Sequence, residues 1–231
     1  MHLPQPDLEW RDDKIPVSLQ FDDPYFSLDN GLHETRHVFL AGNGLPDRFS
    51  DGFHIAELGI GTGLNLLTTL LEWRRTKQNG TLHFTSFEAY PMSPADMVLA
   101  QSAFPEIAAI AAEFAPLWPE LWQTGRLETP ELFLSVVIGD ARQTLPNSDL
   151  EADCWFLDGF SPAKNPELWD ADLMQAVADH TDPLGTFATY TAAGFVRRNL
   201  EAAGFSVERS AGYGRKRHMT TGTKKDAKNA K

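Results

Sequence analysis

A glycine-rich segment near the end of the first quarter of the chain is the strongest indication of chemistry. The segment Glu57-Leu-Gly-Ile-Gly-Thr-Gly63 follows the apolar run Phe53-His-Ile-Ala56 and precedes the helix-like stretch 64–71. Glycine permits positive φ angles and lets a ligand approach the first N–H groups of a helix, which attract polar or anionic groups. The pattern predicts a strand, a turn and a helix that bind a nucleotide-like cofactor. The alternative is a glycine turn that binds no ligand.

The spacing of these glycines distinguishes between cofactors. The dinucleotide fingerprint G-x-G-x-x-G, begun at Gly59 and Gly61, would place its third glycine at Leu64, but a glycine occurs one position earlier, at Gly63. This spacing disfavours NAD and favours S-adenosylmethionine. Glu57, at the end of the strand, also suits a cofactor with a cationic amino acid better than one with a pyrophosphate.

Acidic residues follow four of the predicted strands. Ligands of open α/β sheets bind outside the carboxyl ends of the strands, so Glu57, Glu88, Asp140 and Asp158 are expected near one site. A carboxylate at Glu88 can accept hydrogen bonds from ribose hydroxyls, and one at Asp140 from the amino group of adenine. Each acid alone is also compatible with an ordinary loop or a helix cap. The four together indicate a binding site.

The segment Asp158-Gly-Phe-Ser-Pro162 is the second candidate for chemistry. Methyl transfer to an amine is an in-line displacement at a sulfonium, for which an enzyme aligns the nucleophile and keeps it unprotonated. Asp158 can hold an amine and accept its proton, and Phe160 can stack on a planar base. Whether Asp158 is a base or only an anchor stays open, and a core position is the alternative for Phe160.

The elements that must position these residues follow from the alternation of strand-like and helix-like stretches. Strands are predicted at 53–58, 82–87, 133–138, 154–157, 186–190, 205–208 and near 218–221, and helices at 64–75, 93–100, 104–114, 166–180 and 193–203. Such alternation predicts an α/β fold with a mostly parallel twisted sheet and helices on both faces.

The ends of the chain have different compositions from this main domain, which spans residues 46–223. Residues 1–16 are rich in Pro and Asp and are expected to form a flexible arm. Residues 17–45 are expected to form a small β-rich N-terminal extension, with strand-like sequence at 17–21 and 35–40. Residues 224–231 are expected to be a disordered basic tail.

Length and composition limit the class of protein. The 231 residues suffice for one large α/β domain. The single cysteine, Cys154, lies in an apolar run, which indicates a core thiol and a reducing compartment. No signal peptide is recognisable, and no run reaches the roughly 18 apolar residues of a membrane helix. We expect a cytoplasmic protein with no membrane partner and no metal site.

The charge is unevenly distributed along the chain. The net charge is −12, but residues 191–231 contain ten Lys and Arg against three Asp and Glu, which gives this part a charge of +7. Binding of a polyanion depends on local rather than total charge, so a nucleic-acid partner is compatible with the sequence. For the residues after Thr223 a solubilising tail is the alternative.

Several motifs together resemble the MnmC/MnmD family of tRNA methyltransferases. They run in the family order through most of the chain: 21–27 (FDDPYFS), 29–36 (DNGLHETR), 57–65 (ELGIGTGLN), 86–88 (SFE), 155–166 (WFLDGFSPAKNP), 192–198 (AAGFVRR) and 212–217 (GYGRKR). The glycine loop is common to many methyltransferases. The motifs at 157–166 and 214–217 are far more specific to this family.

The resemblance implies a Rossmann-like class I methyltransferase that acts on 5-aminomethyl-2-thiouridine at the tRNA wobble position. It implies S-adenosylmethionine bound by Glu57, Gly59, Gly61, Gly63, Asn65, Glu88 and Asp140, an aminomethyl uracil oriented by Asp158 and Phe160, and tRNA phosphates bound by Lys164, Arg197, Arg198, Arg215, Lys216 and Arg217. Some family members also carry an FAD-dependent oxidase. We expect no FAD in this chain, so it should act only on a substrate whose amine is already exposed and which another route supplies. The alternative is that the tail marks where a longer protein was divided.

Two other classes of function remain open at the level of the sequence. A small-molecule N-methyltransferase or aminopropyltransferase of the same fold would not need the basic C-terminal region. A non-catalytic module that binds an adenosine cofactor or RNA would need no proton acceptor at Asp158.

Overall fold

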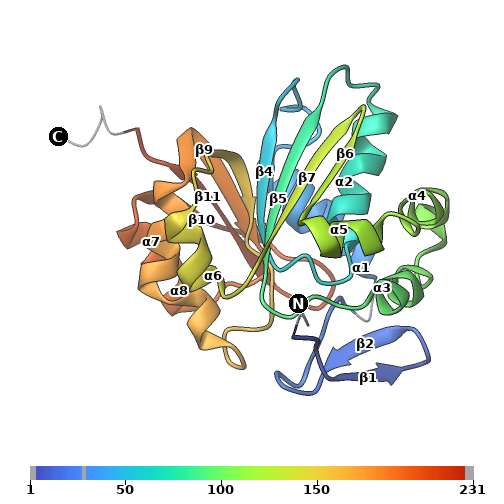
Figure 1. Ribbon diagram of the computed structural model, residues 1–231. Coiled ribbons are helices and arrows are strands. Elements are labelled where there is room, and N and C mark those ends of the chain that lie inside the picture. Colours follow the sequence, from blue (N-terminus) through green and yellow to red (C-terminus); the bar gives the residue numbers. More distant parts are fainter. Residues whose placement is uncertain (1–3, 28–29, 227–231) are drawn as a thin grey trace.

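A twisted sheet forms the centre of the computed structural model, which describes residues 4–27 and 30–226 (Figure 1). Within these residues the sheet has eight strands in the order β10-β11-β9-β8-β4-β5-β7-β6. Their bounds are β4 His54–Leu58, β5 Leu82–Glu88, β6 Arg126–Thr129, β7 Leu132–Ile138, β8 Ala152–Phe156, β9 Thr181–Thr189, β10 Phe205–Ala211 and β11 His218–Lys224. The five strands β4, β5, β7, β8 and β9 are parallel, whereas β6, β11 and β10 pair antiparallel with their neighbours.

Helices cover both faces of this sheet (Figure 1). One face carries α1 Gly31–Thr35, α2 Leu64–Arg75, α3 Pro94–Gln101, α4 Ala108–Phe114 and α5 Trp118–Thr124, and the other carries α6 Ala141–Thr144, α7 Ala171–Asp179 and α8 Gly194–Ala202. Each face has its own apolar core, centred on Trp73 and Trp118 on the first and on Trp155 and Trp169 on the second. The predicted α/β fold with helices on both faces is confirmed.

The parallel strands all end at the same edge of the sheet, which we call the carboxyl edge. The loops that follow β4, β5, β7, β8 and β9 therefore meet there. Strand β11 pairs antiparallel with β9, with Thr220 opposite Thr189, so the β10–β11 turn lies at the same edge. Helix α2 has the predicted bounds and leads away from this edge. This arrangement brings the loops that carry the predicted site residues together.

The prediction of a flexible arm at residues 1–16 is wrong for most of its length. Strands β1 Leu8–Arg11 and β2 Ile15–Ser18 pair antiparallel, and β3 Asp23–Pro24 adds a short third strand. The turn between β1 and β2 has positive φ angles at Asp12 and Asp13, a conformation that Asp tolerates. The acidic residues that suggested a disordered arm thus form a hairpin turn.

The second half of the predicted β-rich extension is helical. Asn30 caps α1 by accepting a hydrogen bond from the His33 N–H, and a π-helical turn, η1 Arg36–Leu40, and a 3₁₀ turn, η2 Ala41–Asn43, continue the chain. The sequence Asp29-Asn30-Gly31 is therefore followed by a helix start and not by a hairpin. Leu32 and residues 38–40 belong to the first core, so this segment is packed into the main domain.

Smaller differences concern elements that were not predicted and the ends of predicted ones. Helix α5 and strand β6 were not predicted, and the expected helix 166–180 is divided into a 3₁₀ turn, η5 Pro166–Trp169, and α7, with Asp170 as the N-cap of α7. The remaining 3₁₀ turns are η3 Pro105–Ile107 and η4 Leu145–Asn147. Strand β11 extends through Lys224, which pairs with Phe205, so the predicted tail begins too early. Its residues 227–231 lie outside the described part of the chain.

In the described part of the chain, no single helix combines the length and apolar character needed to span a membrane. One helix pair bent by 116°, Pro94–Gln101 with Pro105–Phe114, meets the length and composition test only when its two members are taken together.

Candidate active site

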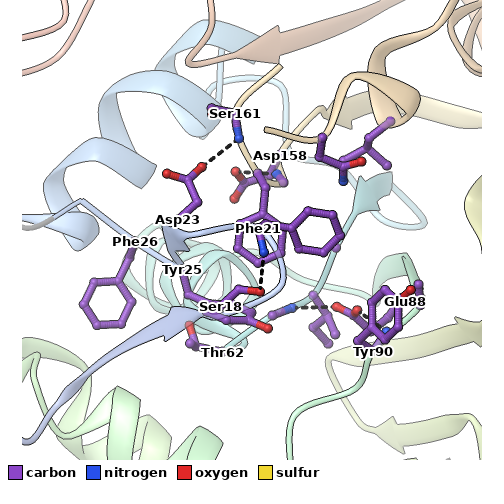
Figure 2. A pocket seen from close by; sticks show the side chains of 18 of the residues that line it. Ser18, Phe21, Asp23, Tyr25, Phe26, Thr62, Glu88, Tyr90, Asp158 and Ser161 are labelled. Carbon is purple, nitrogen blue, oxygen red and sulfur yellow. Dashed lines mark hydrogen bonds between the residues drawn. The ribbon is translucent and has the colours of Figure 1, made fainter. Parts of the chain in front are cut away.

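A cavity of about 590 Å³ opens at the carboxyl edge, between the large sheet and the N-terminal strands (Figure 2). This volume is in the range typical of sites for small molecules and cofactors. Figure 2 shows Asp158 and Ser161 on one side of the cavity and Glu88 and Tyr90 on another. Of the predicted site residues, the following line it: Gly59, Gly61, Asn65, Glu88, Asp140, Asp158, Phe160 and Lys216.

The glycine loop forms one wall of the cavity. Gly59 has a φ of +82°, and a Cβ added there would meet no atom within 4 Å, so the backbone faces open space. Gly61 lies under Tyr25, whose Cδ1 would be 3.2 Å from an added Cβ. Gly63, the N-cap of α2, does not line the cavity and instead packs against Met97. The loop thus exposes its backbone to the cavity at Gly59 and Gly61.

Glu88 closes β5 directly opposite this loop. The Gly61 N–H donates to its Oε2 at 3.1 Å, and the Tyr90 N–H donates to its Oε1 at 2.8 Å. Burial raises the pKa of Glu88, although these N–H groups oppose the shift. Because a carboxylate can accept about four hydrogen bonds, both oxygens keep capacity for further donors. The exposed glycine backbone and this carboxylate fit a cofactor that presents hydroxyl groups, such as adenosine.

Glu57 occupies a different position from the one predicted. Its side chain is fully buried and does not line the cavity. It accepts hydrogen bonds from Asn65 Nδ2 at 2.9 Å and from Ser86 Oγ at 2.9 Å, and burial raises its pKa to about 8. Glu57 therefore lies behind the wall of the site and reaches the cavity through Asn65.

Asp158 faces the cavity directly after β8. Its Oδ2 accepts from Asn65 Nδ2 at 2.8 Å, and its Oδ1 accepts from the Gly159 N–H at 2.8 Å. Burial raises its pKa to about 6, with Glu34 adding to the shift and Lys216 opposing it. At neutral pH this leaves a carboxylate that can accept a proton.

Asp140 lies at the rim of the cavity and is already paired. Its side chain caps α6 by accepting from the Arg142 N–H, and both of its oxygens accept from the Arg142 guanidinium at 2.6–3.0 Å. The guanidinium lowers the pKa of Asp140. Its position is the predicted one, and the helix-cap alternative considered for it from the sequence is also present.

An aromatic cluster covers the cavity near Asp158. The rings of Phe21 and Phe160 stack with centroids 4.6 Å apart, and Tyr25 meets Phe160 edge-on at 5.1 Å. The Ser161 N–H donates to Asp23 Oδ2 at 2.7 Å, as Figure 2 shows. Sequence reasoning assigned no role to Phe21, Asp23 or Tyr25. The signal was the aromatic and acidic segment 21–27, which marked only a family resemblance.

The predicted basic residues lie at the carboxyl edge but outside the cavity, apart from Lys216. Lys164 follows β8 and pairs with exposed Asp22 at 2.9 Å. Arg197 and Arg198 occupy the first half of α8, where Arg198 is exposed and Arg197 is partly buried. Arg215 and Arg217 are exposed in the β10–β11 turn.

Glu34 and Tyr190 also line the cavity and were not predicted. Lys216 Nζ donates to Glu34 Oε1 at 2.7 Å and lies 4.1 Å from the centre of the Tyr190 ring. The Tyr190 hydroxyl donates to the Gly159 carbonyl at 2.8 Å. No local pattern links residues so far apart in the sequence. Among residues 4–27 and 30–226, no group of three or more His, Cys, Asp or Glu side chains is placed to hold a metal ion.

Comparison with known proteins identifies relatives of this chain. The chain is 45% identical over 235 residues to the tRNA 5-methylaminomethyl-2-thiouridine biosynthesis bifunctional protein MnmC of Aeromonas hydrophila subsp. hydrophila, a match that covers 93% of this chain and 35% of that protein. The chain thus spans about a third of the length of this curated relative. The crystal structure of MNMC2 from Aquifex aeolicus is similar with a TM-score of 0.77 and 26% identity, over 96% of this chain and 72% of that one. The resemblance to MnmC is confirmed.

A family model gives the broader assignment. The model of S-adenosyl-L-methionine-dependent methyltransferases matches residues 105–225, which is more than half of the chain and includes Asp140, Asp158 and the β10–β11 turn. The chain belongs to this family of S-adenosyl-L-methionine-dependent methyltransferases.

Proposed function

We propose that this methyltransferase acts on the exocyclic amine of 5-aminomethyl-2-thiouridine at the wobble position of tRNA, giving 5-methylaminomethyl-2-thiouridine. The observation that carries the proposal is that the glycine loop and Asp158 face one cavity and are joined through Asn65. The name of the Aeromonas relative contains the same modified nucleoside.

The donor side of the cavity consists of the glycine loop and the acids beside it. When bound, S-adenosylmethionine supplies a methyl group on a sulfonium that an amine can displace in line. Gly59, Gly61 and Glu88 would hold its polar groups, and Asp140 would accept from the amino group of its adenine. Asn65 forms part of this wall, and Gly63 and Glu57 support it from behind.

The acceptor side consists of Asp158 and the aromatic cluster. Asp158 accepts a proton from the amine, because its pKa of about 6 leaves it ionised at neutral pH. Phe160 orients the uracil by stacking. Because Phe21 already stacks on Phe160, an entering base has to displace the Phe21 ring or extend the stack.

Basic residues along the carboxyl edge bind the tRNA backbone in this proposal. These residues follow strands β8, β9 and β10 on the side of the molecule where the cavity opens. They are Lys164, Arg197, Arg198, Arg215 and Arg217. Phosphate contacts of this kind position a nucleic acid without reading its sequence. Arg197, being partly buried, is expected to contribute least.

The test is methylation of defined tRNA. Purified protein is incubated with methyl-labelled S-adenosylmethionine and tRNA that carries 5-aminomethyl-2-thiouridine, and the labelled nucleoside is identified after digestion. We expect label at the wobble uridine. Labelling of small amines but not of this tRNA would instead favour a small-molecule N-methyltransferase.

A variant of Asp158 tests the mechanism. Asp158→Asn keeps an oxygen that can accept from the Gly159 N–H but removes the proton acceptor, so kcat is expected to fall about 10²- to 10⁴-fold with the fold retained. Circular dichroism and binding of S-adenosylmethionine are the controls for folding. Full turnover in this variant would remove Asp158 from the proton transfer.

A further inference from the structure

An ion pair between distant segments lies beside the proposed acceptor site. Glu34 belongs to α1 and is 8% exposed, and Lys216 belongs to the β10–β11 turn. Their side chains are joined by a hydrogen bond of 2.7 Å, and the Lys216 side chain remains 43% exposed. Lys216 also lies over the Tyr190 ring. The pair therefore holds a cation at a defined place in the cavity.

The cavity that contains this pair has an acidic lining. Among the described residues that line it, six are acidic and two are basic. Arg142 is committed to Asp140, so Lys216 is the cation available near Asp158 and Glu34. Asp23 accepts from the Ser161 N–H, and Glu88 accepts from two backbone N–H groups, so hydrogen bonds but no cation compensate these two acids.

Neither of two simpler roles explains the pair. A part-buried ion pair is not by itself stabilising, because desolvation and exposure to solvent offset its attraction. A lysine whose ammonium donates to a carboxylate and lies on a ring is also less available to a phosphate than a lysine without such contacts. Acidic surroundings have a direct chemical consequence, however, because negative charge raises the pKa of an amine and keeps it protonated.

We propose that Lys216 is a positioning residue for the acceptor. By neutralising Glu34, Lys216 leaves Asp158 as the carboxylate that receives the amine. It also favours the deprotonated form of that amine. This inference rests on the proposed function and gives Lys216 a role other than the phosphate contact expected from the sequence. The acceptor arrives as an ammonium ion and gives one proton to the Asp158 carboxylate. The freed lone pair forms the N–C bond as the C–S bond breaks and its electron pair stays on sulfur. The product leaves as a methylated ammonium ion, and Asp158 returns its proton to water, which restores the carboxylate.

The proposal predicts opposite effects for the two partners. Lys216→Met leaves Glu34 uncompensated, so the acidic limb of the kcat–pH profile is expected to move up by roughly 0.5 to 1 pH unit. Glu34→Gln is expected to move it down. The double variant removes both charges and is expected to lie near the wild type, and Lys216→Arg, which keeps the charge, is expected to do the same.

The titratable and charged groups around the proposed acceptor position come from several elements and set the same profile. They are Glu34 on α1, Asp23 on β3, Asp158 after β8, Tyr190 after β9 and Lys216 in the β10–β11 turn. Glu88, Asp140 with Arg142, and Glu167 line the rest of the cavity. Glu57 lies behind Asn65. Only Glu34 and Lys216 change in this series. The double variant restores the balance of charge but not the original packing, so it separates an effect of charge from an effect of lost packing.

A direct measurement uses the full chain without methyl donor. An anticodon stem-loop with ¹⁵N in its aminomethyl group is bound to wild type and to each variant, and the pKa of the amine is read from the ¹⁵N chemical shift during a pH titration. We expect a higher amine pKa in Lys216→Met than in wild type. The comparison variant Arg217→Met is expected to raise KM for tRNA and to leave the amine pKa and the acidic limb in place.

The possible results distinguish a failure of the inference about Lys216 from a failure of the proposed function. If Lys216→Met raises KM only, with the amine pKa and the acidic limb unchanged, Lys216 is a phosphate contact and the inference is wrong. If the double variant shifts as far as Lys216→Met alone, neutralisation of Glu34 is not the cause. If wild-type protein neither binds nor methylates the stem-loop, the proposed function itself is wrong.

Discussion

Asn65 is the residue on which the geometry of the site depends most. Its Nδ2 donates to Glu57 Oε1 and to Asp158 Oδ2, and its Oδ1 accepts from Thr35 Oγ1 at 2.7 Å. Both amide hydrogens and the amide oxygen are therefore used. One side chain links a fully buried carboxyl group to the one that faces the cavity, and the pKa of each is raised by burial.

The raised pKa of Glu57 predicts that stability falls as pH rises. The folded protein holds this proton up to about pH 8, whereas the unfolded chain releases it near the ordinary value of 4.5. Between these values the folded state binds more protons, so the free energy of unfolding decreases with pH. Asp158, with a folded pKa of about 6, contributes in the same direction over a narrower window.

Glu57→Gln is expected to remove most of this dependence. Its amide oxygen can still accept from Asn65, and its NH₂ can donate to Ser86, but it has no proton to lose. Relative to wild type, the variant is expected to gain roughly 1 kcal/mol or more between pH 5 and pH 8, measured by urea unfolding. Exposed Glu106→Gln controls for the loss of one negative charge. Parallel curves for Glu57→Gln and wild type would contradict the prediction.

At the scale of elements, the end of the β2–β3 connection and the start of β3 attach the N-terminal sheet at the cavity. Phe21 stacks on Phe160, Asp22 pairs with Lys164, and Asp23 accepts from the Ser161 N–H. All three partners lie in the loop that follows β8. The small N-terminal sheet is thus attached to the loop that carries Asp158 and Phe160.

Asp23→Ala is expected to loosen this attachment. The hydrogen bond to the Ser161 N–H is part-buried, so its loss should increase hydrogen exchange at that amide. KM for the tRNA is expected to rise because the loop is less ordered. Asp22→Ala removes only an ion pair with an exposed partner and is expected to leave the Ser161 exchange rate unchanged. Equal exchange rates at Ser161 in Asp23→Ala and wild type would show that this contact does not hold the loop.

The elements show what the sequence could and could not predict. Helix α2 was predicted to the residue because a glycine turn and a long run of apolar residues define it. The segment 35–40 was misjudged because its apolar and β-branched residues fit a strand, while tertiary packing and the Asn30 cap favour a helix. The β1–β2 hairpin was missed because its acidic turn resembled a disordered sequence.

The site residues also divide into those that the sequence could predict and those that it could not. Gly59, Glu88 and Asp158 could be placed because strand ends share one edge of a parallel sheet. The burial of Glu57 could not be predicted, because it depends on where the Asn65 and Ser86 side chains point. The Glu34–Lys216 pair joins segments 182 positions apart and appears only when the fold brings them together.

At the scale of the whole molecule, an acidic protein carries a group of exposed arginines at the carboxyl edge. The net charge is −12, yet exposed Arg198, Arg215 and Arg217 lie at the carboxyl edge, near the cavity. The acidic remainder of the protein repels a polyanion, whereas the exposed arginines attract it. The proposed tRNA substrate is therefore expected to approach the side of the molecule where the proposed acceptor site opens.

This group of arginines predicts that the salt dependence of tRNA binding comes from a few residues. A phosphate contact releases counterions, so replacing Arg198 or Arg217 with Ala is expected to lower the slope of log Kd against log salt by about one per residue. The control is Arg75→Ala, an exposed arginine 62% accessible at the far end of α2, which pairs with Glu72. Filter binding or fluorescence anisotropy of tRNA across a salt series measures the slope. Because all three variants lose one positive charge, a slope that falls equally in all of them would mean that net charge, and not the carboxyl edge, governs tRNA binding.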